Sequence, residues 1–238
     1  MVARLAGIYN DNPNLPAPEQ AWFPLIESVF DRASQLTGVN YVYEANDDGR
    51  DLRFSPGVLG VRPDIRIGGR EVDGVGSVSA FNFFPNFGGD MVLDTADDVW
   101  DDTRQDSLRL RNTIAHENVH GLGVRHVCPL DQTKLMENRY TDAIDGLQHD
   151  DILALQRLYG DPLEPNDIFL VASDMGTLTT GLITVDGVSI DDAADADVFR
   201  FRLNSDQRTN FVVQPVGSTY LSGTERSDGS CNLGRLFD

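Results

Sequence analysis

The sequence predicts an α+β domain with three helices and several short strands over residues 1–160, followed by a smaller β-rich module over residues 161–238. Three observations favour this division. Apolar residues recur at helical spacing in three segments of the first part. Short runs of β-branched and aromatic residues lie between the first two of these segments. An acidic, proline-containing stretch at 161–167 then precedes strand candidates without a convincing long helix.

The three helices are predicted from apolar spacing and from their end signals. The first runs from about residue 18 to residue 36, and Gly38 is a suitable stop. The second follows Asp106-Ser107, which can serve as an N-cap, and extends to about Leu122. The third covers residues 150–159, with Gly160 placed for a left-handed cap.

Short strands are predicted between and after these helices. The first part offers candidates at residues 39–43, 64–67, 78–84 and 91–93. Before residue 18 the chain is rich in Asn and Pro, as loops are, and only Leu5 to Tyr9 is a weak strand candidate. The second part offers candidates near residues 178–185, 198–203 and 210–216. About 75 residues is close to the lower limit for an independent core.

Charge and composition exclude several classes of protein. The chain of 238 residues has 19 basic and 38 acidic residues, so its formal net charge is −19. Such a surface repels phosphate, which argues against nucleic acid and anionic membranes as partners. Hydrophobic residues make up 40%, too many for a disordered acidic tail. The apolar runs are far shorter than the roughly 20 residues of a membrane-spanning helix.

The cysteines and the N-terminus carry little functional information. Cys128 and Cys231 are far apart, so there is no disulfide framework, and a single bridge between them is the one pairing available. We expect Cys128 to be a small packed residue. No signal peptide is visible at Met1, so the protein is either cytosolic or an exported product whose start lies outside this chain.

The chemistry is concentrated in the segment from His116 to His126. Two histidines four residues apart, His116 and His120, stand on one face of the predicted helix. Gly123 allows a sharp exit from that helix, which brings His126 round as a third ligand. Three neutral imidazoles leave the fourth position of a zinc ion open to water, as in catalytic sites. Glu117 is then placed to take a proton from that water, whose pKa zinc lowers from about 15.7 to about 7.

A structural interpretation of these histidines is the alternative. A single His in a helix is usually structural or exposed, and a bare His-Glu-x-x-His occurs by chance. The longer pattern, however, contains three of the four histidines in the chain at set spacing. We therefore predict a metal site.

Residues 116–126 match the His-Glu-x-x-His-x-x-Gly-x-x-His signature of the metzincin metallopeptidases. Leu135 to Tyr140 resembles their Met-turn, in the form found in matrixins, the matrix metalloproteinase type. The resemblance implies that Met136 supports the zinc ligands from beneath and that Tyr140 helps to wall the S1′ pocket. Matrixins usually have a proline two residues after the methionine; here it is Asn138, so the outer wall of the pocket differs.

Other segments extend the resemblance over about residues 20–160. Residues 148–160 resemble the closing matrixin helix, and residues 83–90 with Trp100 resemble the fourth and fifth strands. The implied fold is a metzincin, or zincin-like, domain with a mixed twisted sheet. Its edge strand at 78–84 would pair with an extended substrate, with Ala80 and Phe81 in contact with it. The implied activity is that of a monomeric zinc metalloendopeptidase, in which zinc-bound water attacks a peptide carbonyl and Glu117 is the general base.

The resemblance to matrixins also raises the question of a second zinc site and a calcium site. Matrixins bind a second, structural zinc through other histidines; His149 alone is left over here, so we expect no such site and an exposed His149 at a helix start. Asp94 with Asp97 or Asp98 lies where matrixins hold calcium with acidic ligands. The alternative for these residues is a solvated acidic turn.

The C-terminal part resembles the bacterial pre-peptidase C-terminal domain, a β-sandwich attached to secreted bacterial proteases. The resemblance rests on Glu164 to Asp167 and on Asp195 to Phe201. It implies a secreted bacterial protein, and a β-sandwich that is truncated because its last strands are not found. Four acidic residues in this part either bind calcium or, as composition favours, form a solvated loop: Asp191, Asp192, Asp195 and Asp197.

Two other functions remain open from the sequence. The chain could be a non-catalytic adhesion or binding module with a vestigial zinc site, although an intact Glu117 argues against this. It could also be an inactive fragment, since the first strand of the matrixin fold is not found before residue 18.

Overall fold

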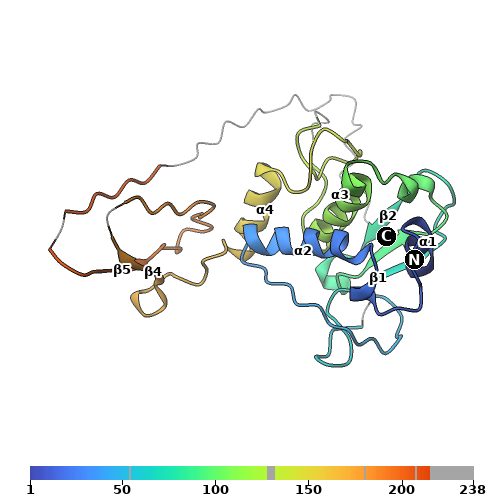
Figure 1. The fold of residues 1–238 in the computed structure, drawn as a ribbon, viewed down its shortest axis with the longest axis horizontal. Helices are drawn as coiled ribbons and strands as arrows, with labels where there is room; N and C mark the ends of the chain where they lie inside the picture. The colour runs from blue at the N-terminus through green and yellow to red at the C-terminus, as the bar shows by residue number, and fades with distance from the viewer. Residues whose placement is uncertain (54, 128–131, 180, 207, 215–238) are drawn as a thin grey trace.

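The computed structural model describes residues 1–53, 55–127, 132–179, 181–206 and 208–214. Four α-helices occur in this part of the chain: α1 (Val2–Ile8), α2 (Phe23–Leu36), α3 (Arg104–Gly121) and α4 (His149–Tyr159). A sheet of short strands lies beside α1 and α3, and the segment that carries β4 and β5 extends away beyond α4 (Figure 1). None of the helices in the described ranges is both long and apolar enough to cross a membrane.

The sheet of the larger part is mixed, as predicted. Its order is β1 (Ile67–Arg70), β3 (Met91–Asp94), β2 (Ala80–Asn82). The central strand β3 runs parallel to β1 and antiparallel to β2. All four residues of β3 are buried, which explains its apolar run from Met91 to Leu93. Strand β2 lies at an edge of this sheet, as the sequence predicted for its segment.

The helix predictions are confirmed for α2, α3 and α4, but a fourth helix was not expected. The weak strand candidate at Leu5 to Tyr9 is wrong, because residues 2–8 form α1. Its residues Ala3, Arg4, Leu5 and Ala6 are good helix formers. Leu5 and Ala6 are also almost completely buried, so this helix contributes to the core.

The strand predictions are only partly confirmed. The segment at 39–43 forms no strand; its Tyr41 instead packs edge-on against Phe30 and donates a hydrogen bond to Asn118 at 2.8 Å. Side-chain packing therefore holds this segment where a strand ladder was expected. The candidate at 64–67 is displaced to 67–70, and the one at 78–84 is shortened to three residues.

Helix α3 begins differently from the prediction. It starts at Arg104, and Gln105, Asp106 and Ser107 all have left-handed backbone angles, with φ of 52°, 56° and 55°. Regular helical geometry follows from Leu108, one residue after the predicted N-cap pair. No side chain caps this end by hydrogen bonding; the Ser107 hydroxyl contacts the Tyr9 hydroxyl at 2.5 Å instead.

The core surrounds α3. Helix α2 packs along α3, and α3 in turn contacts β2 and β3. Three α3 side chains, Leu110, Ile114 and Val119, are at most 1% exposed, so the helix is fixed on more than one side. The buried cluster joins α1, α2, β3, α3 and the turn that contains Met136. The residues between Ile114 and Val119 are thereby held in a defined position.

The C-terminal part contains the parallel pair β4 (Ser173–Leu178) and β5 (Phe199–Leu203). Strand β5 confirms the candidate at 198–203, whereas β4 ends where the candidate at 178–185 was expected to begin. Residues 210–214 form no strand, and residues 215–216 lie outside the described residues, as do both cysteines. The described residues of this part form a two-stranded sheet and not a β-sandwich.

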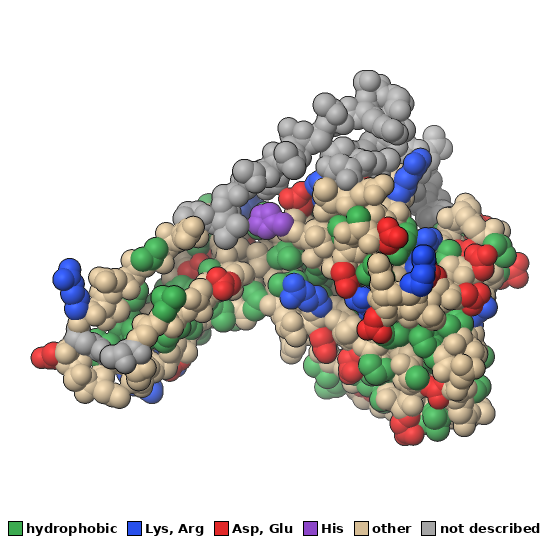
Figure 2. All heavy atoms as spheres, turned by 45° about the horizontal axis from the view of Figure 1, so that its top comes forward, with side chains coloured by type: hydrophobic (Ala, Val, Ile, Leu, Met, Phe, Trp, Pro, Cys, Tyr) green, Lys and Arg blue, Asp and Glu red, His purple; other side chains and the backbone are tan. Residues whose placement is uncertain are grey.

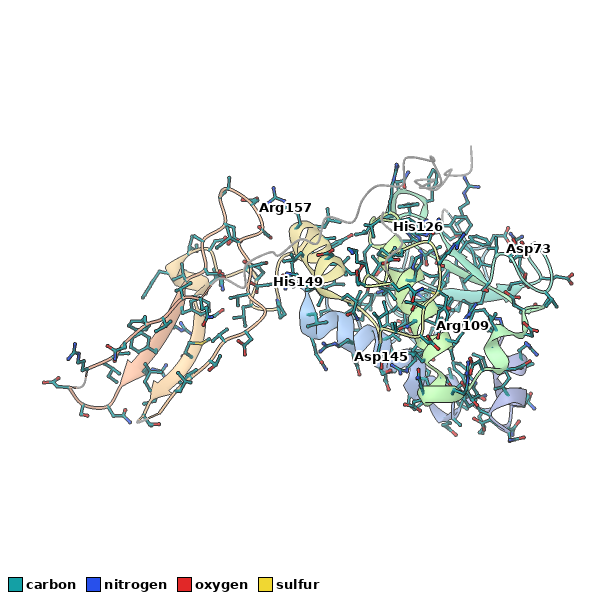
Figure 3. The ribbon with its side chains drawn as sticks, turned by 90° about the horizontal axis from the view of Figure 1, so that it is seen from above. Asp73, Arg109, His126, Asp145, His149 and Arg157 are labelled. Carbon is teal, nitrogen blue, oxygen red and sulfur yellow. The ribbon has the colours of Figure 1, made fainter. Side chains whose placement is uncertain are left out.

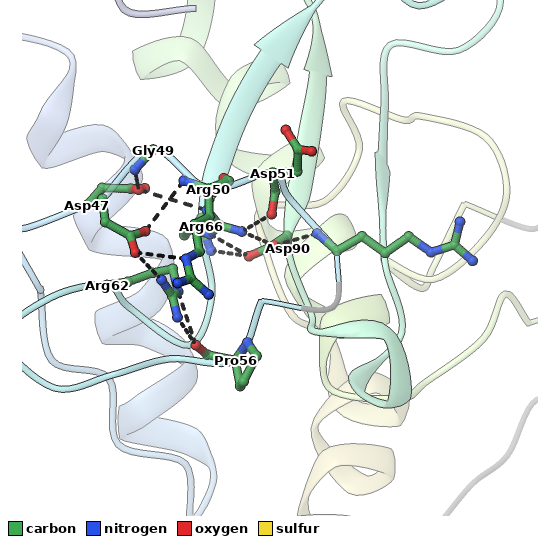
Figure 4. A network of polar contacts seen from close by, with 10 residues as sticks. Asp47, Gly49, Arg50, Asp51, Pro56, Arg62, Arg66 and Asp90 are labelled. Carbon is green, nitrogen blue, oxygen red and sulfur yellow. Dashed lines mark hydrogen bonds and ion pairs between the residues drawn. The ribbon is translucent and has the colours of Figure 1, made fainter.

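A buried ion pair attaches the loop at 47–56 to the sheet (Figure 4). The Arg66 guanidinium donates to Asp90 at 3.0 Å and to the backbone carbonyls of Arg50 and Asp51 at 2.6 and 2.8 Å. Asp90 also accepts the backbone N–H groups of Arg66 and Arg53, each at 2.9 Å. Both charged side chains are at most 4% exposed, so the stability of this ion pair depends on each of these hydrogen bonds being made.

We predict that Asp90→Ala lowers the free energy of unfolding by about 3–5 kcal/mol, because it leaves the buried Arg66 cation with only the more distant and more exposed Asp47, at 3.8 Å, as a counterion. Urea denaturation followed by circular dichroism measures this loss. The matched control is Asp101→Ala, which removes an exposed partner of Arg4 and should cost less than about 1 kcal/mol. Equal effects of the two substitutions would contradict the role assigned to Arg66 and Asp90.

Candidate metal centre

Two elements position the three predicted ligands. His116 and His120 are one turn apart on α3, so their side chains stand on the same face of the helix. The chain then leaves the helix through Gly123, whose φ of +99° is rarely adopted by residues with a side chain. This exit returns His126 to the helix, and the three imidazoles form one group. In Figure 3, His126 and Arg109 lie toward opposite ends of α3.

The three rings face one another through their Nε2 atoms. Nε2 of His126 lies 3.0 Å from Nε2 of His116 and 3.1 Å from Nε2 of His120. The other ring nitrogens are oriented by backbone carbonyls. Nδ1 of His116 lies 2.8 Å from the oxygen of Leu135, and Nδ1 of His120 lies 2.7 Å from that of Val124. A carbonyl oxygen can only accept a hydrogen bond, so the Nδ1 atom that faces it must carry the proton. The Nε2 atoms of His116 and His120 therefore present lone pairs.

This arrangement fits a zinc ion. A proton on Nε2 of His126 can be donated to only one of the two facing Nε2 acceptors, whereas a metal cation between the rings serves all three. Tetrahedral zinc with bonds of about 2.0–2.1 Å places its nitrogen ligands about 3.3 Å apart, close to the observed spacing. Three nitrogen ligands leave one coordination position open, as catalytic zinc sites require.

Electrostatics also keep the imidazoles neutral. Burial, together with the electrostatic effect of His120 and His126, lowers the pKa of His116 to about 3. Burial likewise lowers the pKa of His120 to about 4 and depresses that of His126. Neutral imidazole is the form that binds metal. The site is therefore ready for a cation at neutral pH without first losing protons.

Glu117 lies beside these ligands as a buried, incompletely bonded carboxyl group. It is 7% exposed, and its Oε2 atom has no hydrogen-bond partner among the described residues. Burial raises the pKa of Glu117 to about 8. A carboxyl group near its pKa at neutral pH can both accept and return a proton.

The predicted Met-turn is bonded to the segments that carry the histidines. Met136 is completely buried, its carbonyl accepts the N–H of Val127, and the carbonyl of Leu135 orients His116. Sequence analysis missed Asp151 of α4, whose carboxylate accepts the N–H groups of Leu135 and Met136 at 2.9 and 3.2 Å. Asp151 also completes a capping box with Gln148, and this three-residue spacing was the signal available in the sequence.

The predicted substrate residues are not brought into one cavity, and Tyr140 contacts Arg109, which lies toward the opposite end of α3 from His126. Ala80 and Phe81 are in edge strand β2, and the ring of Phe84, which follows that strand, lies 5.7 Å from the ring of His120. Tyr140 is 38% exposed, and the guanidinium of Arg109 stacks 4.0 Å above its ring. Tyr140 and Arg109 border a small cavity of about 90 Å³, lined also by acidic residues.

Asp94 and Asp97 are buried and surrounded by backbone amides. Asp94 accepts the N–H groups of Asp73 and Ala96 at 3.1 and 2.8 Å, and Asp97 accepts that of Gly76. Desolvation raises the pKa of Asp94, but these amide bonds outweigh it and bring the pKa below its usual value. The Oδ2 atom of Asp97 is buried without a partner in the described part of the chain. These two residues are thus not an exposed, solvated turn.

A helix that presents two histidines and a carboxylate, with a third histidine after a glycine turn and a methionine turn beneath, defines a zinc-dependent metallopeptidase. The profile of the matrixin family matches residues 8–160, more than half of the chain. The chain therefore belongs to the matrixin family, which consists of metalloendopeptidases, and its three histidines form the zinc-binding site. A search of curated proteins found no significant match.

We predict that Glu117→Gln stabilises the zinc-free protein as the pH rises. The folded-state pKa of Glu117 is about 8, above its unfolded value near 4.5. The native carboxyl group thus costs no stability below pH 4.5, and stability falls as the pH rises from 4.5 to 8, because the unfolded state releases this proton while the buried group retains it. The neutral amide avoids this cost, which is on the order of 3–5 kcal/mol above pH 8.

Urea denaturation of chelator-treated protein at pH 5 and pH 9 measures the difference. The variant should resemble the wild type at pH 5 and exceed it at pH 9. The exposed Glu27→Gln is the control, and it should show no such divergence. A constant difference at both pH values would show that Glu117 is not a buried, uncompensated carboxyl group.

Proposed function

We propose that the protein cleaves peptide bonds within extended segments of protein substrates, with Glu117 as the group that moves the proton. The observation that carries this proposal is the buried carboxyl group of Glu117, adjacent in sequence to the first of three converging histidines. A structural metal site would need no such group. The family supports a peptide bond as the target.

The residues of the site have separate roles in the proposed reaction. Zinc held by His116, His120 and His126 would polarise the scissile carbonyl and lower the pKa of water toward 7. Glu117 accepts the proton of the attacking water as general base and returns it to the leaving amine as general acid. Its pKa of about 8 before metal binding reflects burial, and a nearby cation lowers it toward the ionised form. Met136 packs beneath the ligands and keeps their positions fixed.

We further propose that the substrate binds along β2. Among the strands of the described residues, this one pairs with β3 alone, so its other edge would be available to an added strand. Ala80 and Phe81 would then contact substrate side chains, and Tyr140 would border the S1′ pocket. The stacking of Arg109 on Tyr140 supports a fixed position for that ring.

Calcium at Asp94 and Asp97 is a second part of the proposal. The unpartnered Oδ2 atom of Asp97 supports it, because a buried carboxylate oxygen without a donor needs a cation or a water. Both side chains lie where β3 ends and the loop at 73–76 crosses it. Calcium would therefore connect this loop to the sheet.

The last part of the proposal concerns the division of the chain into two parts, its oligomeric state, its location and its partner. We propose a catalytic part at residues 1–160 and an appendage at 161–238 that is related to the pre-peptidase C-terminal β-sandwich, in a monomeric, secreted bacterial protein. The net charge of −19 supports a protein partner over nucleic acid. Acidic side chains are spread across the face shown in Figure 2, with Lys and Arg among them.

We predict that Glu117→Ala lowers the rate of casein cleavage by at least about 10², because the proton acceptor is lost. Zinc content should remain near one per chain, since all three histidines are intact. Metal analysis and a casein assay measure the two quantities. Glu27→Ala, an exposed change on α2, is the control for expression and handling. Undiminished activity in a zinc-loaded Glu117→Ala variant would reject the assigned role.

For the calcium proposal, we predict that Asp97→Asn reduces the increase in melting temperature that calcium causes in the zinc-loaded protein. The amide keeps the size of the side chain but removes the charge that a calcium ligand supplies. Differential scanning calorimetry with and without 5 mM calcium, a concentration on the order of the weakest protein calcium sites, measures the shift. The exposed Asp98→Asn should leave it unchanged; the same outcome for both would count against a site at Asp97.

A further inference from the structure

Two arginine side chains lie over aromatic rings at the two ends of the segment 81–84. The guanidinium of Arg70, the last residue of β1, lies 5.8 Å from the ring centre of Phe81 in β2. The guanidinium of Arg125 lies 5.9 Å from the ring centre of Phe84. A cation is attracted to the face of an aromatic ring within about 6 Å. These contacts place a positive charge at each end of the segment.

This segment connects the edge of the sheet with the metal centre. Its first residues, Phe81 and Asn82, belong to β2, the strand proposed above to pair with substrate. At its other end, the ring of Phe84 lies 5.7 Å from the ring of His120, one of the three zinc ligands. A peptide that extends along β2 to the metal centre would therefore pass both positive charges.

The alternation of side chains along a strand brings substrate groups next to these rings. Phe81 and Phe83 meet edge-on, with ring centres 5.5 Å apart, so they share one face of the sheet. Side chains of an added strand on this face would lie about 4.5–5.5 Å from the side chain directly opposite. A third guanidinium, that of Arg53, lies 5.6 Å from the ring centre of Phe83, so positive charge borders this face beside both rings.

The hydrogen-bonding groups of Arg70 and Arg125 remain available. The attraction to a ring uses the charge of a guanidinium but leaves its five N–H donors without oxygen acceptors. Both side chains are exposed, and in the ranges that the structure describes neither forms an ion pair or a side-chain hydrogen bond. Each can therefore bind a carboxylate, which accepts two parallel N–H bonds from one guanidinium.

The charge of the remaining chain gives these two arginines their importance. Acidic residues outnumber basic ones, 38 to 19, and Arg62, Arg66 and Arg111 each bind an aspartate. A negative net charge repels acidic peptides from most of the surface. Guanidinium groups without an acidic partner beside β2 are thus the feature that decides whether an acidic segment is accepted there.

We propose that Arg70 and Arg125 are specificity-determining residues, which favour extended substrate segments with aspartate or glutamate side chains beside β2. The inference rests on the proposed function, because it requires that substrate pairs with this strand. Each guanidinium donates hydrogen bonds to a substrate carboxylate. The ring against which it lies limits the orientations of the arginine before binding, so less conformational entropy is lost when the carboxylate arrives.

The test uses labelled casein-derived peptides that differ only in Glu or Gln, placed at one position at a time. Binding to the zinc-loaded Glu117→Ala protein is measured by fluorescence anisotropy, because this variant keeps the three histidines and leaves the peptide intact. At one or more positions, Glu should bind at least about threefold more tightly than Gln at low salt. This preference should shrink in about 1 M salt, where charges are screened beyond about 3 Å.

Substitutions in the same Glu117→Ala protein assign the preference to the arginines. Arg70→Gln and Arg125→Gln, made separately, should each reduce the preference for Glu. Arg70→Lys should retain most of it, since the charge is kept, whereas a role limited to covering the ring of Phe81 would give no preference to retain. Arg32→Gln is the matched control: it removes the same charge from an exposed arginine of α2, and the preference should stay at its original value.

Cleavage of the same peptides by the zinc-loaded wild type separates this inference from the proposed function. Cleavage without any preference for Glu, in kcat/KM or in binding, overturns the inference and leaves the peptidase intact. No cleavage, together with a binding preference that Arg70→Gln reduces, overturns the peptidase and supports a site for acidic segments. Zinc content and circular dichroism establish that each variant is folded, and if Arg125→Gln loses zinc, Arg70→Gln decides. An equal preference in Arg70→Gln and Arg32→Gln also overturns the inference.

Discussion

Three imidazole nitrogens converge, with Nε2 of His126 about 3 Å from those of His116 and His120, and this convergence is the constraint on which the rest of this protein depends. Without a cation this arrangement is unfavourable, since each ring must be neutral and desolvated. The fold maintains it because other groups orient two of the rings through their Nδ1 atoms. Backbone carbonyls of Leu135 and Val124 hold two of the rings in one tautomer.

A series of hydrogen bonds and packing contacts connects the histidine rings to the rest of the domain. The turn that carries the Leu135 carbonyl is bonded in turn to Asp151, which accepts the N–H groups of Leu135 and Met136. Asp151 is in turn part of the first turn of α4, whose start it caps together with Gln148. On the other side, α3 is packed by α2 and by the sheet. The geometry of the three ligands therefore depends on the whole domain at residues 8–160 that matches the matrixin family.

Buried carboxylates are stabilised in two different ways in the same molecule. The buried Asp90 is neutralised by Arg66, a side chain of the protein itself. Asp94 is stabilised by backbone amides, which bear only partial charges. The buried Asp161 likewise accepts the backbone N–H groups of Leu163 and Ser189, at 2.7 and 2.8 Å.

The sequence by itself determined the ligand set, because His116, His120, Gly123 and His126 act through local geometry: helical spacing and one left-handed turn. It also determined α2, α3, α4 and the buried strand β3, whose apolar patterns are strong. Only the tertiary structure decided that residues 39–43 pack as irregular chain, that residues 2–8 form a helix, and that Asp151 binds the turn at Met136. These outcomes depend on partners distant in sequence, such as Asn118 for Tyr41, and no local pattern records which distant group a side chain will meet.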